Sequence, residues 1–436
     1  MKRPRIILIL ALSLVLLAAS AASPQQILSI DPAERTVPAA TAAGPTAALQ
    51  PTDTYHWLDR KLEPSLLKIA LNGNSDKQIR FIVELDQQAD LPSFAGESAR
   101  QTQGSSVVTE LQLAARQAQA GLLAFLAAQQ AEGHVHHYRS FWVFNGIAVT
   151  GNADTMLTIA ARPEVRLIRE DRWQQWVEPL LAEQSLDPLS DAASQWNITQ
   201  IRADLAWNNL AITGSGVTVG IMDTGVDWQH PALKTQYRGY KPGGVSVHEG
   251  NWFCATDEDY PYPYDGYGHG THVTGTAVGS QDTNGVAIGV APKAQWIAVK
   301  TFSNGGYAYD SWIHSAFEWL LAPAGDPTLA PDIVNASWGA ANGANETFRP
   351  DLQALRAAGI VPVFSAGNNG PYPRTVGSPA SFPEAIAVGA TDDLDQVTSF
   401  SSRGPSPWGE IKPEVSAPGA QIRSSLPGGT YGTANG

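Results

Sequence analysis

Residues 217–225 read Val-Thr-Val-Gly-Ile-Met-Asp-Thr-Gly, an apolar run that ends in a carboxylate and a glycine. Short apolar runs bounded by turn-forming residues are typical of strands buried on both faces of a parallel sheet. Further runs of this kind follow at 296–300, 333–337, 360–364 and 385–388, with helical spacing at 309–321 and 351–358. Strands that alternate with helices predict an α/β fold with a doubly wound, mostly parallel sheet.

Asp223 stands where the first of these strands ends. In open α/β sheets, functional groups gather outside the carboxyl ends of the strands, so Asp223 is a candidate catalytic residue. Aspartic proteases also use Asp-Thr-Gly, but they pair two such carboxylates, and the tripeptide occurs here only once. We therefore expect Asp223 to act with a residue of another type.

The segment 268–276, Gly-His-Gly-Thr-His-Val-Thr-Gly-Thr, supplies that residue. Glycines beside His269 allow close approach of the backbone, and the small residues that follow suit a helix packed tightly on the sheet. An imidazole acts as a base when a carboxylate holds its other nitrogen, which predicts a pair of His269 with Asp223. A zinc site built on His269 and His272 lacks the further ligand of the zinc-protease motifs, so His272 is interpreted as a structural residue.

A third motif, Ser365-Ala-Gly-Asn-Asn-Gly370, follows the apolar run 360–364. The amide of Asn368 could donate a hydrogen bond to the oxyanion of a tetrahedral intermediate. Taken alone, the segment is more typical of an Asn-Gly turn that has no catalytic role.

Together with Asn335-Ala-Ser-Trp-Gly339, these motifs resemble the subtilisin-like serine protease family in residues and order, over 196–436. The phrases at 296–300 and 400–405 are most similar to its bacillopeptidase F branch. The resemblance implies that Asp223 orients His269, that His269 is the general base and acid, and that Asn368 completes the oxyanion hole. It further implies two substrate-binding segments: Ser337, Trp338 and Gly339 as an edge strand, and Ser365, Ala366 and Gly367 in the first specificity pocket.

The sequence departs from the family pattern in two places. The family continues Asn-Gly-Thr-Ser-Met-Ala where this sequence reaches Asn435-Gly436, so the nucleophilic serine is expected at the second position beyond Gly436. Residues 1–436 alone are then expected to be inactive. The loop 280–286 carries Asp282 and Asn284 but is one residue longer than the usual calcium-binding loop of the family, so calcium is an optional structural ion and no cofactor is required.

A smaller α+β domain is predicted over 78–170. Its pattern is a strand at 78–85, a helix at 106–130, extended residues at 135–149, a helix at 153–161 and a strand at 165–168. This order predicts a ferredoxin-like, split β-α-β domain, and it is similar to the inhibitory propeptide of the same family. His134, His136 and His137 lie in this domain, but no cysteine or carboxylate pattern completes a metal site around them.

The N-terminus predicts secretion. A basic start, an apolar run at 6–19 and Ala19-Ser-Ala21 indicate a signal peptide at 1–22 rather than a stable membrane anchor. The segment 23–77 is expected to be a linker with a short helix, and the polar segment 171–195 an exposed, cleavable linker. A net charge of −13 disfavours nucleic acid, and the single cysteine, Cys254, rules out a disulfide within this sequence.

The function expected from the sequence is therefore a secreted serine endopeptidase precursor with protein or peptide substrates and its own propeptide as partner. The rival is a catalytically dead subtilisin-like module that holds peptides without cutting them. Retention of Asp223, His269 and Asn368 favours the enzyme.

Overall fold

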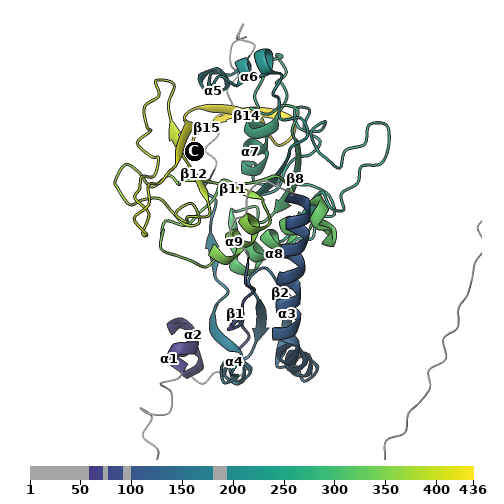
Figure 1. The fold of residues 1–436 in the computed structure, drawn as a ribbon, viewed down its shortest axis with the longest axis vertical. Helices are drawn as coiled ribbons and strands as arrows, with labels where there is room; N and C mark the ends of the chain where they lie inside the picture. The colour runs from purple at the N-terminus through teal and green to yellow at the C-terminus, as the bar shows by residue number, and fades with distance from the viewer. Residues whose placement is uncertain (1–57, 72–76, 92–99, 180–193) are drawn as a thin grey trace, which may run out of the picture. The chain divides into compact units, whose positions relative to one another are not determined.

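The computed structural model describes residues 58–71, 77–91, 100–179 and 194–436 (Figure 1). The expected signal peptide at 1–22 and most of the expected linker at 23–77 lie outside these ranges. Two short helices, α1 (Leu58–Lys61) and α2 (Pro64–Leu71), come first and pack beside the small domain. Among the described residues, no helix combines the length and the apolar character needed to cross a membrane.

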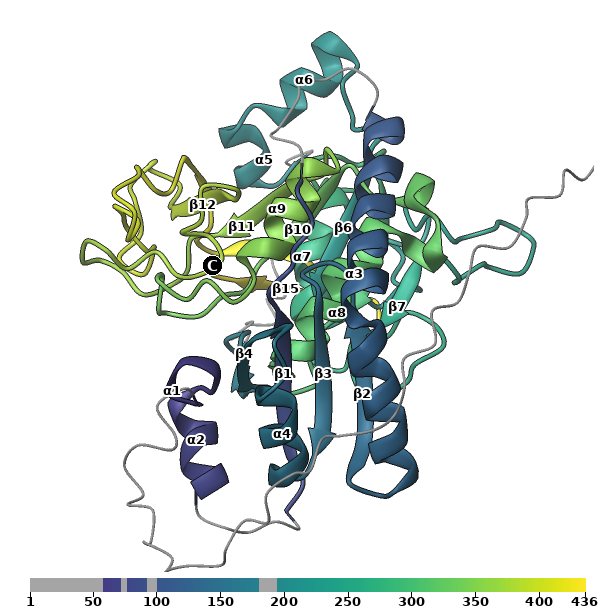
Figure 2. The same cartoon turned by 60° about the horizontal axis from the view of Figure 1, so that its bottom comes forward.

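The small domain has the predicted ferredoxin-like order (Figure 2). Its elements are β1 (Ile79–Leu85), α3 (Arg100–Ala131), β2 (Val135–Phe141), β3 (Gly146–Gly151), α4 (Ala153–Ala160) and β4 (Val165–Glu170). The four strands form one antiparallel sheet in the order β2-β3-β1-β4. Alternating residues such as Phe81 and Val83 are fully buried against Leu122 of α3 and Ile159 of α4, as the period of two along a strand requires.

The large domain contains seven parallel strands in the order β13-β12-β11-β10-β6-β8-β7, which confirms the predicted α/β fold. The strands are β6 (Thr218–Asp223), β7 (Trp252–Cys254), β8 (Gln295–Lys300), β10 (Ile333–Ala336), β11 (Val361–Ser365), β12 (Ile386–Thr391) and β13 (Val415–Pro418). The antiparallel pair β14 (Ile422–Leu426) and β15 (Thr430–Ala434) follows, and α5 (Trp196–Gln200) and α6 (Ala203–Leu210) precede the sheet.

Helices cover both faces of this sheet. Neighbouring residues of β6 point to opposite sides, so that Ile221 packs with Val278 of α7 (His269–Val278) and Met222 joins the core that holds α8 (Asp310–Leu321) and α9 (Arg349–Ala357). The chain runs from β6 to β8 on one side and later returns to β10 on the other side of β6. The topological switch point therefore lies between β6 and β10, where ligands of such sheets bind.

The small domain packs against α8 and α9. Phe141 and Phe144 are buried in the same apolar cluster as these two helices. The carboxylate of Asp171 accepts hydrogen bonds from the backbone N–H (2.9 Å) and the hydroxyl (2.8 Å) of Ser311, in the first turn of α8. A carboxylate at this position satisfies a free N–H and favours the helix dipole, so a residue after β4 caps a helix of the other domain.

The segment after Glu170 differs from the exposed, irregular linker expected at 171–195. Trp173–Gln175 forms β5, which pairs antiparallel with β9 (Tyr307–Tyr309) of the large domain. Trp176 and Val177 are buried, and both donate backbone N–H groups to the carbonyl of Gly306, at 2.9 and 3.1 Å. The sequence did not predict this strand, because Gln174 and Gln175 give it no apolar alternation and its partner strand lies far away in the sequence. Residues 180–193 lie outside the described ranges.

Candidate active site

Asp223 and His269 meet at the switch point of the sheet. His269 is the first residue of α7, and its Nδ1–H donates to Oδ1 of Asp223 at 2.7 Å. Asp223 is fully buried, whereas 16% of the His269 side chain is exposed. Oδ1 of Asp223 also accepts the backbone N–H of Thr224 at 2.7 Å, and the second carboxylate oxygen has no hydrogen-bond partner within the described ranges. The carboxylate thus fixes the tautomer that leaves Nε2 of His269 free to accept a proton.

Glycine is required where α7 packs against the loop after β6 and against β14. A Cβ atom at Gly270 would lie 2.1 Å from the carbonyl oxygen of Gly225, and one at Gly275 would lie 2.2 Å from Oγ of Ser425. Both distances are shorter than any real carbon–oxygen contact, so larger residues would push the helix away. The close helix packing expected from the sequence is therefore what brings His269 to Asp223.

Asp265 holds the loop before His269, a role that the sequence reasoning missed. Its Oδ1 accepts the hydroxyl of Thr224 (3.0 Å) and the N–H groups of Tyr267 (3.0 Å) and Gly268 (2.8 Å). Its Oδ2 accepts the N–H (2.9 Å) and hydroxyl (2.7 Å) of Thr271. Five donors around one buried carboxylate lock the end of β6 to the start of α7. A carboxylate four residues before His269 was the available signal.

The charge of Asp223 sets the protonation of His269. Burial alone favours the neutral imidazole, but the negative charge and hydrogen bond of Asp223, with a smaller effect of Asp265, raise the pKa of His269 above its ordinary value. The neighbouring His272 is different, because burial lowers its pKa to about 4. The ring of His272 lies 3.0 Å from the Ile422 carbonyl, to which its Nε2–H donates. This supports the structural interpretation of His272.

A cavity of about 410 Å³ opens beside His269. Asn368 lies on its wall, just after β11, and the cavity is also lined by Ser337, Trp338, Gly339, Ser365, Ala366 and Gly367. The amide of Asn368 is exposed and donates to the Glu178 carboxylate at 3.3 Å. The structure therefore gathers His269, Asn368 and both expected substrate-binding segments around one cavity, with Asp223 behind His269.

The first of the two binding segments, 337–339, differs in detail from expectation. Residues 337–339 follow β10 without forming a regular strand, but Gly339 donates its N–H to the carbonyl of Trp176 at 3.3 Å. The side chain of Trp338 is buried and packs edge-on against Trp176. The segment 173–178 thus runs from its pairing with β9 to Gly339, and its residues Trp176 and Glu178 line the cavity.

The loop at 280–286 does not fit a calcium site in this arrangement. The Asp282 carboxylate accepts the N–H groups of Asn284 (2.8 Å) and Val286 (3.0 Å) and lies 3.5 Å from Nε of Arg423. A guanidinium beside the carboxylate opposes the binding of a cation. No group of three or more histidine, cysteine, aspartate or glutamate side chains that could hold a metal occurs among the described residues, which include His134, His136 and His137.

Comparison with known families agrees with this geometry. Residues 214–436 match the Subtilase family, which covers more than half of the chain. The chain belongs to the subtilase family. Residues 80–175, which cover the small domain from the second residue of β1 onward together with β5, match the Peptidase inhibitor I9 family. The chain thus combines a domain of the subtilase family with a preceding domain that is similar to the Peptidase inhibitor I9 family.

Named relatives support the same assignment. The chain is 40% identical over 382 residues to Bacillopeptidase F of Bacillus subtilis (strain 168), which covers 84% of this chain and 26% of that protein. It is 38% identical over 243 residues to Subtilisin E of the same organism, a match that covers 55% of this chain and 56% of Subtilisin E. It is 37% identical over 243 residues to Subtilisin of Bacillus pumilus, a match that covers 55% of this chain and 78% of that protein. This subtilase chain therefore spans about a quarter of Bacillopeptidase F and just over half of Subtilisin E.

Proposed function

We propose that this chain is part of a secreted serine endopeptidase precursor that hydrolyses peptide bonds through an Asp-His-Ser triad. Asp223 orients His269, His269 is the general base and acid, and Asn368 donates to the oxyanion. The single observation that carries the proposal is the 2.7 Å hydrogen bond between buried Asp223 and His269, beside a cavity that Asn368 lines. A module that only bound peptides would have no need of this proton-accepting pair.

The substrate is proposed to be an extended protein or peptide segment. The support is the segment 173–178, which pairs with β9 and accepts the N–H of Gly339 within the cleft. The same contacts suit a propeptide that blocks the cleft until it is removed. Under this proposal, the propeptide domain spans 78–170 and the catalytic domain begins at 196. The linker between them begins after the segment 173–178.

The nucleophile is proposed to lie beyond Gly436, which gives a direct test of the function. An organophosphonate probe, which labels activated serines, is applied to residues 23–436 and to the same protein extended by its natural downstream sequence. We expect stoichiometric labelling of the extended protein and none of the shorter one. Labelling of the shorter protein would move the nucleophile to another serine, and an extended protein without labelling would favour the peptide-binding module.

The pH dependence of activity should report the pair of His269 and Asp223. His269 must be neutral to accept a proton, and its pKa is raised by Asp223. Activity should therefore fall on acidification through a pKa above the ordinary histidine value of about 6.5. The measurement is kcat/KM of the extended protein against pH. An acid limb well below that value would contradict the hydrogen-bonded pair as the controlling group.

A further inference from the structure

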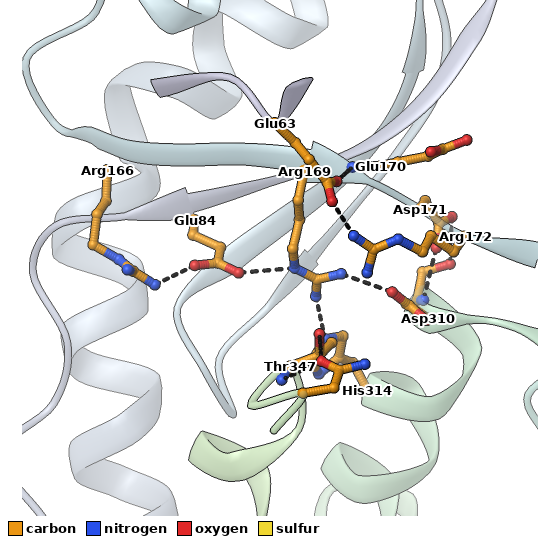
Figure 3. Close-up of polar contacts among 12 residues, drawn as sticks. Glu63, Glu84, Arg166, Arg169, Glu170, Asp171, Arg172, Asp310, His314 and Thr347 are labelled. Atoms are coloured by element: carbon orange, nitrogen blue, oxygen red, sulfur yellow. Dashed lines mark hydrogen bonds and ion pairs between the residues drawn. The ribbon is translucent and has the colours of Figure 1, made fainter. Parts of the chain in front are cut away.

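A buried guanidinium site lies between the small domain and the large domain, where Arg169 of β4 meets α8 (Figure 3). Three nitrogens of Arg169 each reach a different partner. Nε donates to Glu84 (2.8 Å), Nη1 donates to Asp310 (2.9 Å), and Nη2 donates to Nε2 of His314 (2.7 Å). Only 6% of the Arg169 side chain is exposed, although arginine is rarely buried without dedicated partners.

The part of this site that belongs to the large domain has acceptors that suit a guanidinium. A guanidinium can only donate, so Nε2 of His314 must carry a lone pair, and the proton of the neutral ring sits on Nδ1. That Nδ1–H donates to the carboxylate of Asp351, at 2.9 and 3.0 Å. Asp351 therefore fixes the tautomer of His314 that accepts from Arg169. Burial and the charge of Arg169 lower the pKa of His314 well below its ordinary value, in agreement with a neutral ring.

Asp310 is the large-domain carboxylate that contacts Arg169 directly. Its Oδ2 contacts Arg169, while its Oδ1 is buried without a hydrogen-bond partner in the described part of the chain. Its carboxylate side chain is only 2% exposed, as expected of a group enclosed with a cation. The recess of the large domain consists of Asp310, His314 and Asp351. It offers Arg169 two acceptors, the charged carboxylate of Asp310 and the neutral ring of His314, which Asp351 orients. Two separate acceptors match the separated nitrogens of arginine and not the single nitrogen of lysine.

The recess is separate from the catalytic cleft. None of Asp310, His314 and Asp351 lines the cavity that contains His269 and Asn368. On the small-domain side, Glu84 is shared with Arg166, whose side chain is 53% exposed. Arg166 thus carries the same charge to the same carboxylate at the rim, and it provides a matched control for Arg169.

We propose that Asp310, His314 and Asp351 form an arginine-selective binding site of the large domain, through which it recognises Arg169 of its propeptide. The proposal rests on the proposed role of the small domain as a propeptide. It assigns recognition to a position outside the substrate cleft and to a defined ligand chemistry, a guanidinium held by a carboxylate and a neutral imidazole.

The test is chemical rescue of precursor variants that lack the guanidinium of Arg169. The readout is the rate of backbone hydrogen exchange in peptides from β4 and from the first turn of α8. All variants carry His269→Ala, so the chain stays uncut whether or not it is a protease. Arg169→Ala leaves a buried carboxylate unpaired and should speed exchange at least about 100-fold. Millimolar ethylguanidinium, which replaces the deleted atoms, should restore most of the protection, whereas ethylammonium should not.

Three controls make the result decisive. Arg166→Ala should change exchange little and show no rescue, and adding Asp310→Asn to Arg169→Ala should abolish the rescue. Arg169→Lys, which retains the charge and serves if the alanine variant does not fold, should also lose protection. Equal rescue by ethylammonium and ethylguanidinium, or wild-type exchange in Arg169→Lys, would overturn the proposal. Because no turnover is measured, either result leaves the proposed peptidase activity to be judged separately.

Discussion

Replacing His269 with alanine should abolish peptide hydrolysis by the protein extended through its natural downstream sequence. His269 is the only group that the structure places against Asp223 as a proton acceptor at the cleft, at 2.7 Å, within the described residues. Without it, no base would take the proton of the attacking serine. In subtilisin, loss of the histidine alone lowers kcat by about 2 × 10⁶-fold, and we expect a loss of that order here.

The measurement is the initial rate of peptide hydrolysis at saturating substrate, with purified variants. His272→Ala is the matched control, since this histidine lies one turn along α7 and bonds the Ile422 carbonyl. Loss of the His272 side chain should lower the stability of the fold. The kcat of the protein that remains folded should stay close to that of the wild type. If His269→Ala kept a substantial fraction of kcat while remaining inhibited by a serine-directed probe, another residue would be the base.

The positions of the candidate site residues relative to their strands and helix could be predicted from the local sequence pattern. Asp223 ends a buried strand, His269 starts a glycine-rich helix, and Asn368 follows another strand, and each position is readable from its neighbours. Parallel strands bring their carboxyl ends to one edge, so these side chains could be predicted to converge. Their roles remain predictions, while the fold and the family are established.

Interactions between distant segments could not be predicted in this way. Arg169 lies on a strand that reads Val-Arg-Leu-Ile-Arg-Glu, and its alternation does not reveal that one face of the sheet meets α8 rather than water. Asp265 accepts donors from three places in the chain, and Trp173–Gln175 pairs with β9, more than 130 residues later. In each case the partner is defined by tertiary packing, which periodicity does not encode.

Asp223→Asn should lower kcat by about 10⁴-fold without unfolding the protein. Both His269 and the N–H of Thr224 bond the same oxygen, Oδ1. An asparagine whose oxygen stays there leaves its NH₂ in the buried position of Oδ2 and removes the charge that stabilises the imidazolium. The reverse orientation faces the N–H of Thr224 with another donor and holds His269 in the tautomer that cannot accept a proton. Either arrangement impairs general base catalysis.

The pH profile separates this effect from a general loss of structure. Asp223 raises the pKa of His269, so a neutral amide in its place should lower that pKa. Since activity requires neutral His269, the residual activity of Asp223→Asn should persist to lower pH than that of the wild type. A variant that was merely misfolded would lose amplitude and keep the position of the acid limb. Near-full activity of Asp223→Asn, or an acid limb that does not move, would remove Asp223 from the role proposed for it.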